Sequence, residues 1–290
     1  MKVRNQLSLI EIMEMFPNDE TAEKWFIESR WPDGVCCCRC GSDYVQVRPT
    51  RKPQPYRCRD CRKDFSVKTD TLMHSSPLSY RVWAIAIYLF GANPTGLSSG
   101  QLAKLVGITR KSAWHLLHRI RENYGDKEHL LTGTVEADEC YVGGRFRSLH
   151  AAQRRESRLQ PHWGRMVVIG VRERESRICR ARLIQNTTED TILNFIARNV
   201  QPFTARLYTD GSALYEHWPN QKSVCQLRGE YVRGDVSTNG IESLWAGLKR
   251  AWHGTYHSWS RKHCQRYLNE YCVRLNQRAL GTLDAMGAIV

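Results

Sequence analysis

Two cysteine pairs constrain the fold of this chain more than any other feature. Cys37-x2-Cys40 is followed, after 17 intervening residues, by Cys58-x2-Cys61. Each pair fits a tight turn, so its two thiolates can reach one tetrahedral zinc ion. The spacing therefore predicts a zinc ribbon. Because four thiolates leave no open coordination position, we expect this zinc to be structural.

The residues around the pairs support a ribbon but leave its register open. Short strand-like pieces lie at residues 44–47, 56–57 and 65–67. Cys36 would lengthen the first knuckle and Cys38 would shorten it; we favour Cys37. The ribbon is also strongly basic, which predicts either a solvated face or contact with a DNA backbone. Its cations are Arg48, Arg51, Lys52, Arg57, Arg59, Arg62 and Lys63.

The charge balance points to a polyanionic partner. The 290 residues include 43 Lys and Arg against 29 Asp and Glu, a formal net charge of +14. Nucleic acid is the default partner for such a surplus, and an unrelated protein with a basic surface is the alternative. The longest apolar run, residues 82–90, is too short to span a bilayer, and there is no signal-peptide core. We therefore expect a cytoplasmic, nucleoid-associated prokaryotic protein, without a membrane segment, whose 11 cysteines do not form disulfides.

Helical periodicity predicts packing helices in residues 7–30 and 80–90. On the first of them, Leu9, Ile12, Met13 and Phe16 stand at helical spacing and are expected to face inward. These helices carry no recognisable chemistry.

The next two helices form a candidate helix-turn-helix. A short helix capped by Ser98 or Ser99 is expected to reach residue 106, Gly107 turns the chain, and Thr109 caps a second helix to about residue 121. A helix, a glycine turn and a basic helix are typical of a DNA-reading motif, with a plain helical pair as the alternative. The cations expected on the surface of the second helix are Arg110, Lys111, Arg119 and Arg121, and the first two are the candidate DNA contacts.

From residue 134 the pattern changes to strands. They are expected at residues 134–142, 166–171, 178–184, 206–211 and 223–227, with helices at 189–200, 239–252 and 262–277. Residues 145–160 are basic and irregular. This α/β order is compatible with a ribonuclease-H-like core. We expect N-terminal helices over 1–33, the zinc ribbon over 34–70, the helix-turn-helix over 78–124 and the core over 130–282.

Three carboxylates crowd into the first strand of this core. With a side-chain period of two, Glu136 and Asp138 share one face and Glu139 takes the other. Neighbouring carboxylates repel one another unless a positive group lies between them. A divalent metal with oxygen ligands is one candidate, and an edge strand with solvated acids is the alternative.

Two later acids stand where they could join Asp138. Asp210 ends a strand, and Glu242 lies in the first turn of the helix that opens near Asn239. If the two strands are neighbours and the helix packs across them, three carboxylates converge and hold two divalent ions roughly 4 Å apart. Each acid also has an ordinary explanation, because Asp-Gly is a common turn and Glu is common at a helix start.

At these residues the chain resembles the zinc-ribbon-bearing DDE transposases of bacterial insertion sequences, the IS fifteen-ninety-five family with its ISXO-two-like transposase domain. The matches cover nearly the whole chain in order. They are RWPDG at 30–34, YRCRDC at 56–61, FSV at 65–67, DECYVGG at 138–144, YTDG at 208–211, NGIESLW at 239–245, LKR at 248–250, GTYH at 254–257, KH at 262–263 and RYLNE at 266–270.

The resemblance implies a ribonuclease-H-like fold in which Asp138, Asp210 and Glu242 bind two Mg²⁺ or Mn²⁺ ions. It also favours the cysteine set 37, 40, 58 and 61 as ligands of one structural Zn²⁺. Lys249 matches a lysine expected to touch the DNA end, with Arg250 beside it, and a solvated helix lysine is the alternative.

The chain departs from the family pattern at three positions. Asp70 stands where glycine is frequent before Thr71, and Gln226 and Ser237 stand where histidine is expected. Some relatives use asparagine as the third ligand, which makes Asn239 a rival or helper of Glu242. These changes leave the acids intact and affect only the surrounding polar groups.

The resemblance implies a DNA transposase with an N-terminal zinc ribbon, a helix-turn-helix and a catalytic core. It would bind the double-stranded terminal inverted repeats of its element, cut their 3′ ends by metal-assisted hydrolysis and join them to target DNA. Joining two ends in one event requires at least a homodimer. The alternatives are a catalytically inactive DNA-binding protein derived from a transposase, which the intact acids argue against, and a related metal-dependent nuclease or resolvase.

Overall fold

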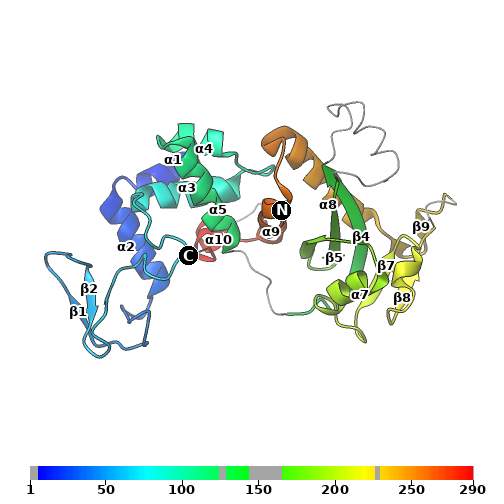
Figure 1. Cartoon of the computed structure of the whole chain (residues 1–290), viewed down its shortest axis with the longest axis horizontal. Coiled ribbons are helices and arrows are strands. Elements are labelled where there is room, and N and C mark those ends of the chain that lie inside the picture. Colours follow the sequence, from blue (N-terminus) through cyan, green and yellow to red (C-terminus); the bar gives the residue numbers. More distant parts are fainter. Residues whose placement is uncertain (1–5, 124–128, 144–164, 226–228, 290) are drawn as a thin grey trace. The chain divides into compact units, whose positions relative to one another are not determined.

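The computed structural model describes residues 6–123, 129–143, 165–225 and 229–289. The irregular segment predicted at 145–160 and Gln226 lie outside the described residues. The chain divides into an N-terminal unit of residues 1–123 and 279–290 and a C-terminal unit of residues 124–278 (Figure 1). None of the helices in the described segments combines the length and the apolar character that crossing a bilayer requires.

The N-terminal unit combines helices with one small sheet. Its elements are α1 (Leu9–Met15), α2 (Asp19–Arg30), β1 (Val45–Val47), β2 (Tyr56–Cys58), β3 (Asp64–Phe65), α3 (Tyr80–Ala92), α4 (Ser99–Val106), α5 (Arg110–Glu122) and α10 (Thr282–Gly287). The strands form an antiparallel sheet in the order β1-β2-β3. The two predicted N-terminal helices and the three ribbon strands are therefore present.

Helix α1 buries a narrower face than the sequence predicts. Ser8 caps it in a reciprocal capping box with Glu11. Ile12 and Phe16 are buried, but the predicted inward positions Leu9 and Met13 are 38% and 46% exposed. A seven-residue helix has room for only one buried stripe, so the prediction for Leu9 and Met13 was wrong.

Helices α4 and α5 are held by the predicted caps. Ser98 accepts a hydrogen bond from the Gln101 amide and Thr109 accepts one from the Ser112 amide. Gly107 ends α4 with a left-handed φ of +69°, a conformation that glycine adopts without strain. The inner face of α5 is buried, and it consists of Ala113, Leu116, Leu117 and Ile120.

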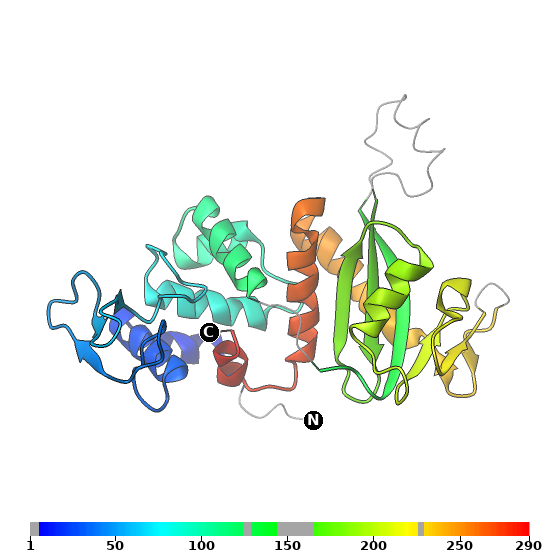
Figure 2. The ribbon, with the colours of Figure 1, turned by 60° about the horizontal axis from the view of Figure 1, so that its bottom comes forward.

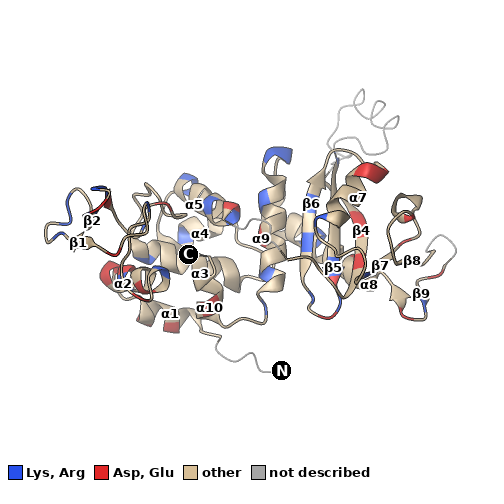
Figure 3. Ribbon diagram, turned by 90° about the horizontal axis from the view of Figure 1, so that it is seen from below, with Lys and Arg blue, Asp and Glu red and all other residues tan. Residues whose placement is uncertain are grey.

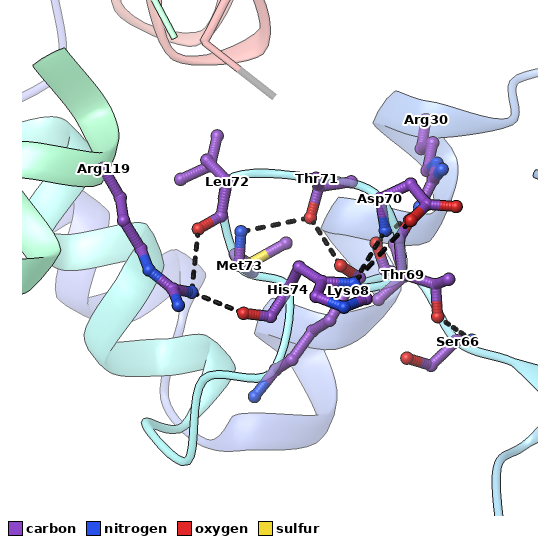
Figure 4. A network of polar contacts seen from close by, with 11 residues as sticks. Arg30, Ser66, Lys68, Thr69, Asp70, Thr71, Leu72, Met73, His74 and Arg119 are labelled. Atoms are coloured by element: carbon purple, nitrogen blue, oxygen red, sulfur yellow. Dashed lines mark hydrogen bonds and ion pairs between the residues drawn. The ribbon is translucent and has the colours of Figure 1, made fainter. Parts of the chain in front are cut away.

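A compact connector, residues 66–76, links the ribbon to α3 (Figure 4). The Arg30 guanidinium, at the end of α2, donates to the carbonyls of Val67 (2.8 Å) and Thr69 (2.6 Å). Arg119 on α5 donates to the carbonyls of Leu72 (3.3 Å) and His74 (2.5 Å). Two arginines from different helices therefore fix the backbone of the connector.

The C-terminal unit is an α/β structure. Its elements are β4 (Thr134–Gly143), β5 (Arg165–Glu173), β6 (Cys179–Ile184), α7 (Glu189–Ala197), β7 (Arg206–Thr209), the 3₁₀ turn η2 (Ala213–Tyr215), β8 (Gln221–Ser223), β9 (Val232–Arg233), β10 (Val236–Ser237), α8 (Asn239–Ala251), the π-helical turn η4 (Trp252–Tyr256), the 3₁₀ turn η5 (Arg261–His263) and α9 (Cys264–Asn276).

The main sheet has five strands in the order β6-β5-β4-β7-β8. β6, β5 and β4 are antiparallel, whereas β4, β7 and β8 run parallel. β4 is central, with hydrogen-bonded neighbours on both sides. Its position explains why its odd and even residues meet different helices, because successive side chains point to opposite faces.

Helices cover both faces of this sheet (Figure 2). One face packs against α7 through a core that includes Val135, Ala137 and Ile196. The other packs against α8 and α9 through a core that includes Cys140, Trp245 and Leu268. The apolar residues of α8 follow a helical spacing that buries one stripe, and they are Ile241, Leu244, Trp245 and Leu248.

Several predicted boundaries shift by a few residues. β8 spans Gln221–Ser223 rather than 223–227, and β7 stops at Thr209, so Asp210 follows the strand instead of ending it. The helix predicted over 189–200 ends at Ala197. Ends of elements depend on hydrogen bonds with distant segments, such as Val224 N–H to the Thr209 carbonyl (3.1 Å), which periodicity does not report.

Candidate metal centres

The four predicted zinc ligands lie together. The Sγ atoms of Cys37 and Cys61 are 3.7 Å apart, and those of Cys40 and Cys58 are 3.6 Å apart. All four sulfurs lie within 4.8 Å of one another. A tetrahedral ion with Zn–S bonds of about 2.3 Å sets its ligand sulfurs about 3.8 Å apart, so the group fits Zn²⁺. Cys36 and Cys38 do not belong to this group.

Both knuckles turn through a left-handed residue directly after their second cysteine. Gly41 has a φ of +75° and donates its N–H to the Cys37 carbonyl (2.9 Å). Arg62 occupies the equivalent place in the second knuckle with a φ of +58°. The sequence indicated the first turn through its glycine, but an arginine gave no such signal for the second.

The cations of the ribbon divide into paired and exposed ones. Arg48 and Arg57 both approach the Asp64 carboxylate, at 2.9 and 3.5 Å, and Arg51 pairs with Glu23 at 2.5 Å. Lys52, Arg59, Arg62 and Lys63 are exposed. Internal ion pairs therefore account for part of the charge that the sequence assigned to a DNA-binding face, and DNA contact by the rest stays a prediction.

The three acids of β4 each have a different partner. Glu136 is 2% exposed, and its carboxylate accepts hydrogen bonds from Arg174 Nε (2.6 Å) and from the Ile241 N–H (2.7 Å). The second contact places the carboxylate at the N-terminus of α8, where the helix dipole favours negative charge. Gly240 permits this approach, because a Cβ there would collide with Glu136 and with Arg172.

Arg174 extends the Glu136 contact to the segment before α8. Its guanidinium donates to the carbonyls of Asp235 (2.7 Å) and Ser237 (2.7 Å) and to the Ser237 hydroxyl (2.6 Å). It also lies over the Tyr208 ring, 4.9 Å from its centroid. Ser237, which replaces an expected histidine, thus helps to hold the start of α8. Arg174 was not predicted from the sequence. The one hint was Glu136, because an acid on a buried strand face needs a cation as its partner.

Asp138 lies on the α8 face of β4. Its Oδ2 accepts a hydrogen bond from the Trp245 indole N–H at 3.0 Å. Gly170 is its cross-strand neighbour on β5, and a Cβ at that glycine would overlap the Trp245 ring. Burial, together with the charges of Asp210 and Glu139, raises the pKa of Asp138 to about 7. The site therefore keeps a proton on this carboxyl up to about pH 7 unless a cation balances its charge.

Asp210 directly follows β7, the strand next to β4. β4 and β7 are parallel, with Glu136 opposite Tyr208 as their last paired residues. Extending this register by two residues beyond the pairing would bring Asp210 level with Asp138 on the same face of the sheet. The electrostatic effect of Asp210 on the pKa of Asp138 is consistent with this proximity. One oxygen of Asp210 accepts the Ser212 N–H at 3.1 Å, which orients the carboxylate.

Glu242 is in the first turn of α8, as predicted, and its Oε1 accepts a hydrogen bond from the Thr238 hydroxyl at 2.9 Å. Asn239 begins the helix and is exposed. Among the described residues, the four cysteines form the one group of three or more His, Cys, Asp or Glu residues that are placed to hold a metal ion. Asp138, Asp210 and Glu242 do not form such a group, so their joint metal site stays a prediction.

Lys249 and Arg250 are exposed in the last turn of α8. Burial raises the pKa of the Cys140 thiol to about 11, and the nearby Lys249 ammonium acts against this rise. Cys140 is two residues along β4 from Asp138 and shares its face. The Lys249 ammonium therefore lies on the same side of the sheet as the Asp138 carboxylate. Figure 3 shows the acidic residues along β4 and the Lys and Arg residues on β5, β6 and α9.

The four cations of α5 have different environments. Arg110 and Lys111, in the first turn, are exposed. Arg119 holds the connector, and Arg121 is only 2% exposed. The prediction that Arg121 lies on the surface was wrong, because the buried face of α5 extends past Ile120 to its last turn.

Comparisons with known proteins match both the region of the four cysteines and the C-terminal unit. Residues 130–276 match the family model of the ISXO2-like transposase domain, and residues 17–64 match the model of a transposase zinc-ribbon domain. The chain is also 26% identical, over 275 residues, to an uncharacterized protein in transposable element ISH50 of Halobacterium salinarum. That alignment covers 90% of this chain and 92% of the relative.

Proposed function

Because the chain belongs to the family defined by the ISXO2-like transposase domain, we propose that it is an active DDE transposase. It binds the ends of an insertion sequence and catalyses 3′-end cleavage and strand transfer. The observation that carries this proposal is the parallel pairing of β4, which bears Asp138, with β7, which Asp210 follows. The N-terminus of α8, near Glu242, is hydrogen-bonded to Glu136 on the Asp138 face of β4.

The architecture supports a ribonuclease-H-like core. In the order β6-β5-β4-β7-β8, the strands β6, β5 and β4 are antiparallel and the strands β4, β7 and β8 are parallel. In such a core the acids come from the first strand, the end of a later parallel strand and a helix across them. β4, the residue after β7 and α8 supply Asp138, Asp210 and Glu242 in these roles.

Three carboxylates on one face are a suitable oxygen donor set for Mg²⁺ or Mn²⁺. Two such ions, when bound, would activate the attacking oxygen and stabilise the leaving one. Asp138 and Asp210 would hold them from the sheet, and Glu242, helped by Asn239, from α8. The Trp245 N–H fixes the orientation of Asp138, and Ser212 fixes that of Asp210.

The reaction consists of two phosphoryl displacements. Water first attacks the phosphodiester at the 3′ end of the element, and the bond to the 3′ oxygen breaks to leave a free 3′-hydroxyl. That hydroxyl then attacks a target phosphodiester, whose own 3′ oxygen leaves. Two element ends join one target, so we propose that a homodimer or larger assembly acts on DNA.

The surface cations support contacts with double-stranded DNA. Arg110 and Lys111 lie in the first turn of α5, the place from which a recognition helix contacts bases. Lys249 and Arg250 lie on the helix that carries Glu242, so they could hold the DNA end near the acids. One zinc ion would stabilise the ribbon through Cys37, Cys40, Cys58 and Cys61 without taking part in the chemistry.

The test is cleavage and joining of a labelled element-end duplex with Mg²⁺ or Mn²⁺. Wild type is expected to give nicked and joined products, and Asp210→Ala neither, while both bind the duplex equally. Asp190→Ala, an exposed acid on α7, is the matched control and should remain active.

Other outcomes would distinguish the alternatives. Binding without cleavage in any metal would support an inactive DNA-binding protein. Cleavage without joined products would support a nuclease. Cleavage that survives Asp210→Ala would mean that the reaction uses a different site.

A further inference from the structure

The third acid of β4, Glu139, faces away from Asp138. Because side chains alternate along a strand, Glu139 points to the α7 face of the sheet, whereas Asp138 points to the α8 face. Its Oε1 accepts a hydrogen bond of 2.7 Å from the Tyr215 hydroxyl. Glu139 is thus adjacent to a candidate metal ligand in sequence but bonded to a different element in space.

Tyr215 is the last residue of η2, the turn that follows Asp210. Its ring is fully buried in the core between the sheet and α7, so the residue cannot move freely. Its N–H bonds to the Ser212 carbonyl at 3.3 Å, and the Ser212 N–H bonds to the Asp210 carboxylate at 3.1 Å. Two hydrogen bonds within this turn therefore connect Asp210 to the backbone of Tyr215 through Ser212.

The Tyr215 hydroxyl links this turn to β4, the strand that carries Asp138. Asp210 itself follows the end of β7, where no ladder hydrogen bond holds it beside β4. The turn after it also needs a left-handed residue, Gly211, with a φ of +84°. β8 holds β7 as far as Thr209, but without a tie to β4 the separation between Asp210 and β4 would depend on this short turn.

We propose that the Tyr215–Glu139 hydrogen bond is a positioning device that sets the distance between Asp210 and Asp138. The inference rests on the proposed function, since it concerns the same metal site. Glu139 acts as a hydrogen-bond acceptor in this role and does not bind the metal, because its side chain lies on the opposite face of the sheet. Tyr215 acts through its hydroxyl alone, because its ring is part of the core.

The test measures Mn²⁺ affinity of the zinc-loaded full chain without DNA, by electron paramagnetic resonance of free Mn²⁺. Tyr215→Phe and Glu139→Ala are expected to weaken Mn²⁺ binding about tenfold or more, the usual effect of losing a group that orients a ligand. Glu139→Gln keeps an acceptor oxygen for Tyr215 and should bind Mn²⁺ with nearly wild-type affinity.

Tyr256→Phe is the matched control, because it also removes a tyrosine hydroxyl from a glutamate. The Tyr256 hydroxyl donates to Glu270 at 2.6 Å within the same unit. This variant should keep the wild-type affinity for Mn²⁺, and urea unfolding of all the variants would reveal any general loss of folding.

Asp210→Ala separates the inference from the proposed function. If Asp210→Ala abolishes Mn²⁺ binding but Tyr215→Phe binds like wild type, the positioning role is wrong and the proposed site stands. If Glu139→Gln loses as much affinity as Glu139→Ala, Glu139 acts through its charge, and the positioning role is again overturned. If Asp210→Ala binds Mn²⁺ normally, the proposed metal site itself is wrong.

Discussion

At the scale of single residues, the C-terminal unit separates acids that are adjacent in sequence. Glu136 pairs with Arg174 and caps α8, Asp138 accepts from Trp245, and Glu139 accepts from Tyr215. Each carboxylate therefore has its own hydrogen-bond donor. Of the three, only Asp138 both faces α8 and would be level with Asp210 if the β4–β7 register continued for two residues, which is why it is the candidate metal ligand.

The raised pKa of Asp138 predicts a pH-dependent stability in the absence of divalent ions. Its pKa rises from the ordinary value of 3.8 to about 7 on folding. The folded protein therefore binds this proton more tightly than the unfolded chain does. The resulting stabilisation is fully present below about pH 4, falls as the pH rises and is lost above about pH 7. Asp138→Asn removes the charge, so this variant should be more stable than wild type at pH 8.

Urea unfolding of the two proteins at pH 8 and pH 5 checks this. The difference at pH 8 is expected to be on the order of a few kcal/mol and to shrink at pH 5. An Asp138→Asn protein that is no more stable than wild type at pH 8 would contradict the proposed environment of Asp138.

Gly170 is predicted to be essential for the packing of Trp245 over Asp138. A methyl group at this position would overlap the indole ring. Gly170→Ala should therefore cost about 1–3 kcal/mol of unfolding free energy, as overpacking usually does. Gly254→Ala is the control in the same unit, because a Cβ there would meet nothing within 4 Å. Equal stability of the two variants in urea unfolding would refute this.

The sequence could predict some of the candidate site residues but not their supports. The sequence points to three acids by their positions in predicted elements. Asp138 is within a predicted strand, Asp210 is at the end of another, and Glu242 is in the first turn of a predicted helix. Arg174 and Tyr215 are not recognisable, because their roles depend on which strands and turns become neighbours. The cysteine register was likewise open until the fold brought one set of sulfurs together.

At the scale of elements, helices with caps were predicted closely and strand ends were not. α4 and α5 begin after the expected Ser98 and Thr109, because capping is encoded by residues next to each helix. The limits of β8 and α7 depend on distant partners, and they differ from the prediction. The face of a helix was predicted less well than its ends, as Leu9, Met13 and Arg121 illustrate.

Helix α5 is predicted to use its cations for two separate purposes. Arg119→Ala should lower the unfolding free energy by about 1.5–3 kcal/mol, because it removes a charged donor from two carbonyls of the connector. Arg110→Ala should leave stability unchanged but weaken DNA binding, because it removes a cation from the end of α5 that is proposed to contact DNA.

Urea unfolding and fluorescence anisotropy with duplex DNA at several salt concentrations measure both effects. An Arg119→Ala protein as stable as wild type would contradict the role of Arg119 in holding the connector. The proposed DNA contact of Arg110 would be wrong if Arg110→Ala bound DNA like wild type at every salt concentration.

At the scale of the whole molecule, the chain joins a unit that contains a zinc-ribbon domain to a unit with its own hydrophobic core. Metal analysis is expected to find one zinc per chain, and Cys58→Ser should lose it and make residues 34–70 sensitive to protease. Cys36→Ser and Cys38→Ser should keep the zinc, because neither sulfur belongs to the group of four. Loss of zinc in either of these two variants would contradict the register.

We propose that acids from β4, from the residue after β7 and from α8 form one metal centre. Anomalous diffraction from crystals of the full chain soaked in Mn²⁺ tests it most directly. We predict manganese density between Asp138 and Asp210, within bonding distance of Glu242, and its loss in Asp210→Ala crystals. Saturating Mn²⁺ without density at Asp138 and Asp210, or with density only elsewhere, would contradict the claim.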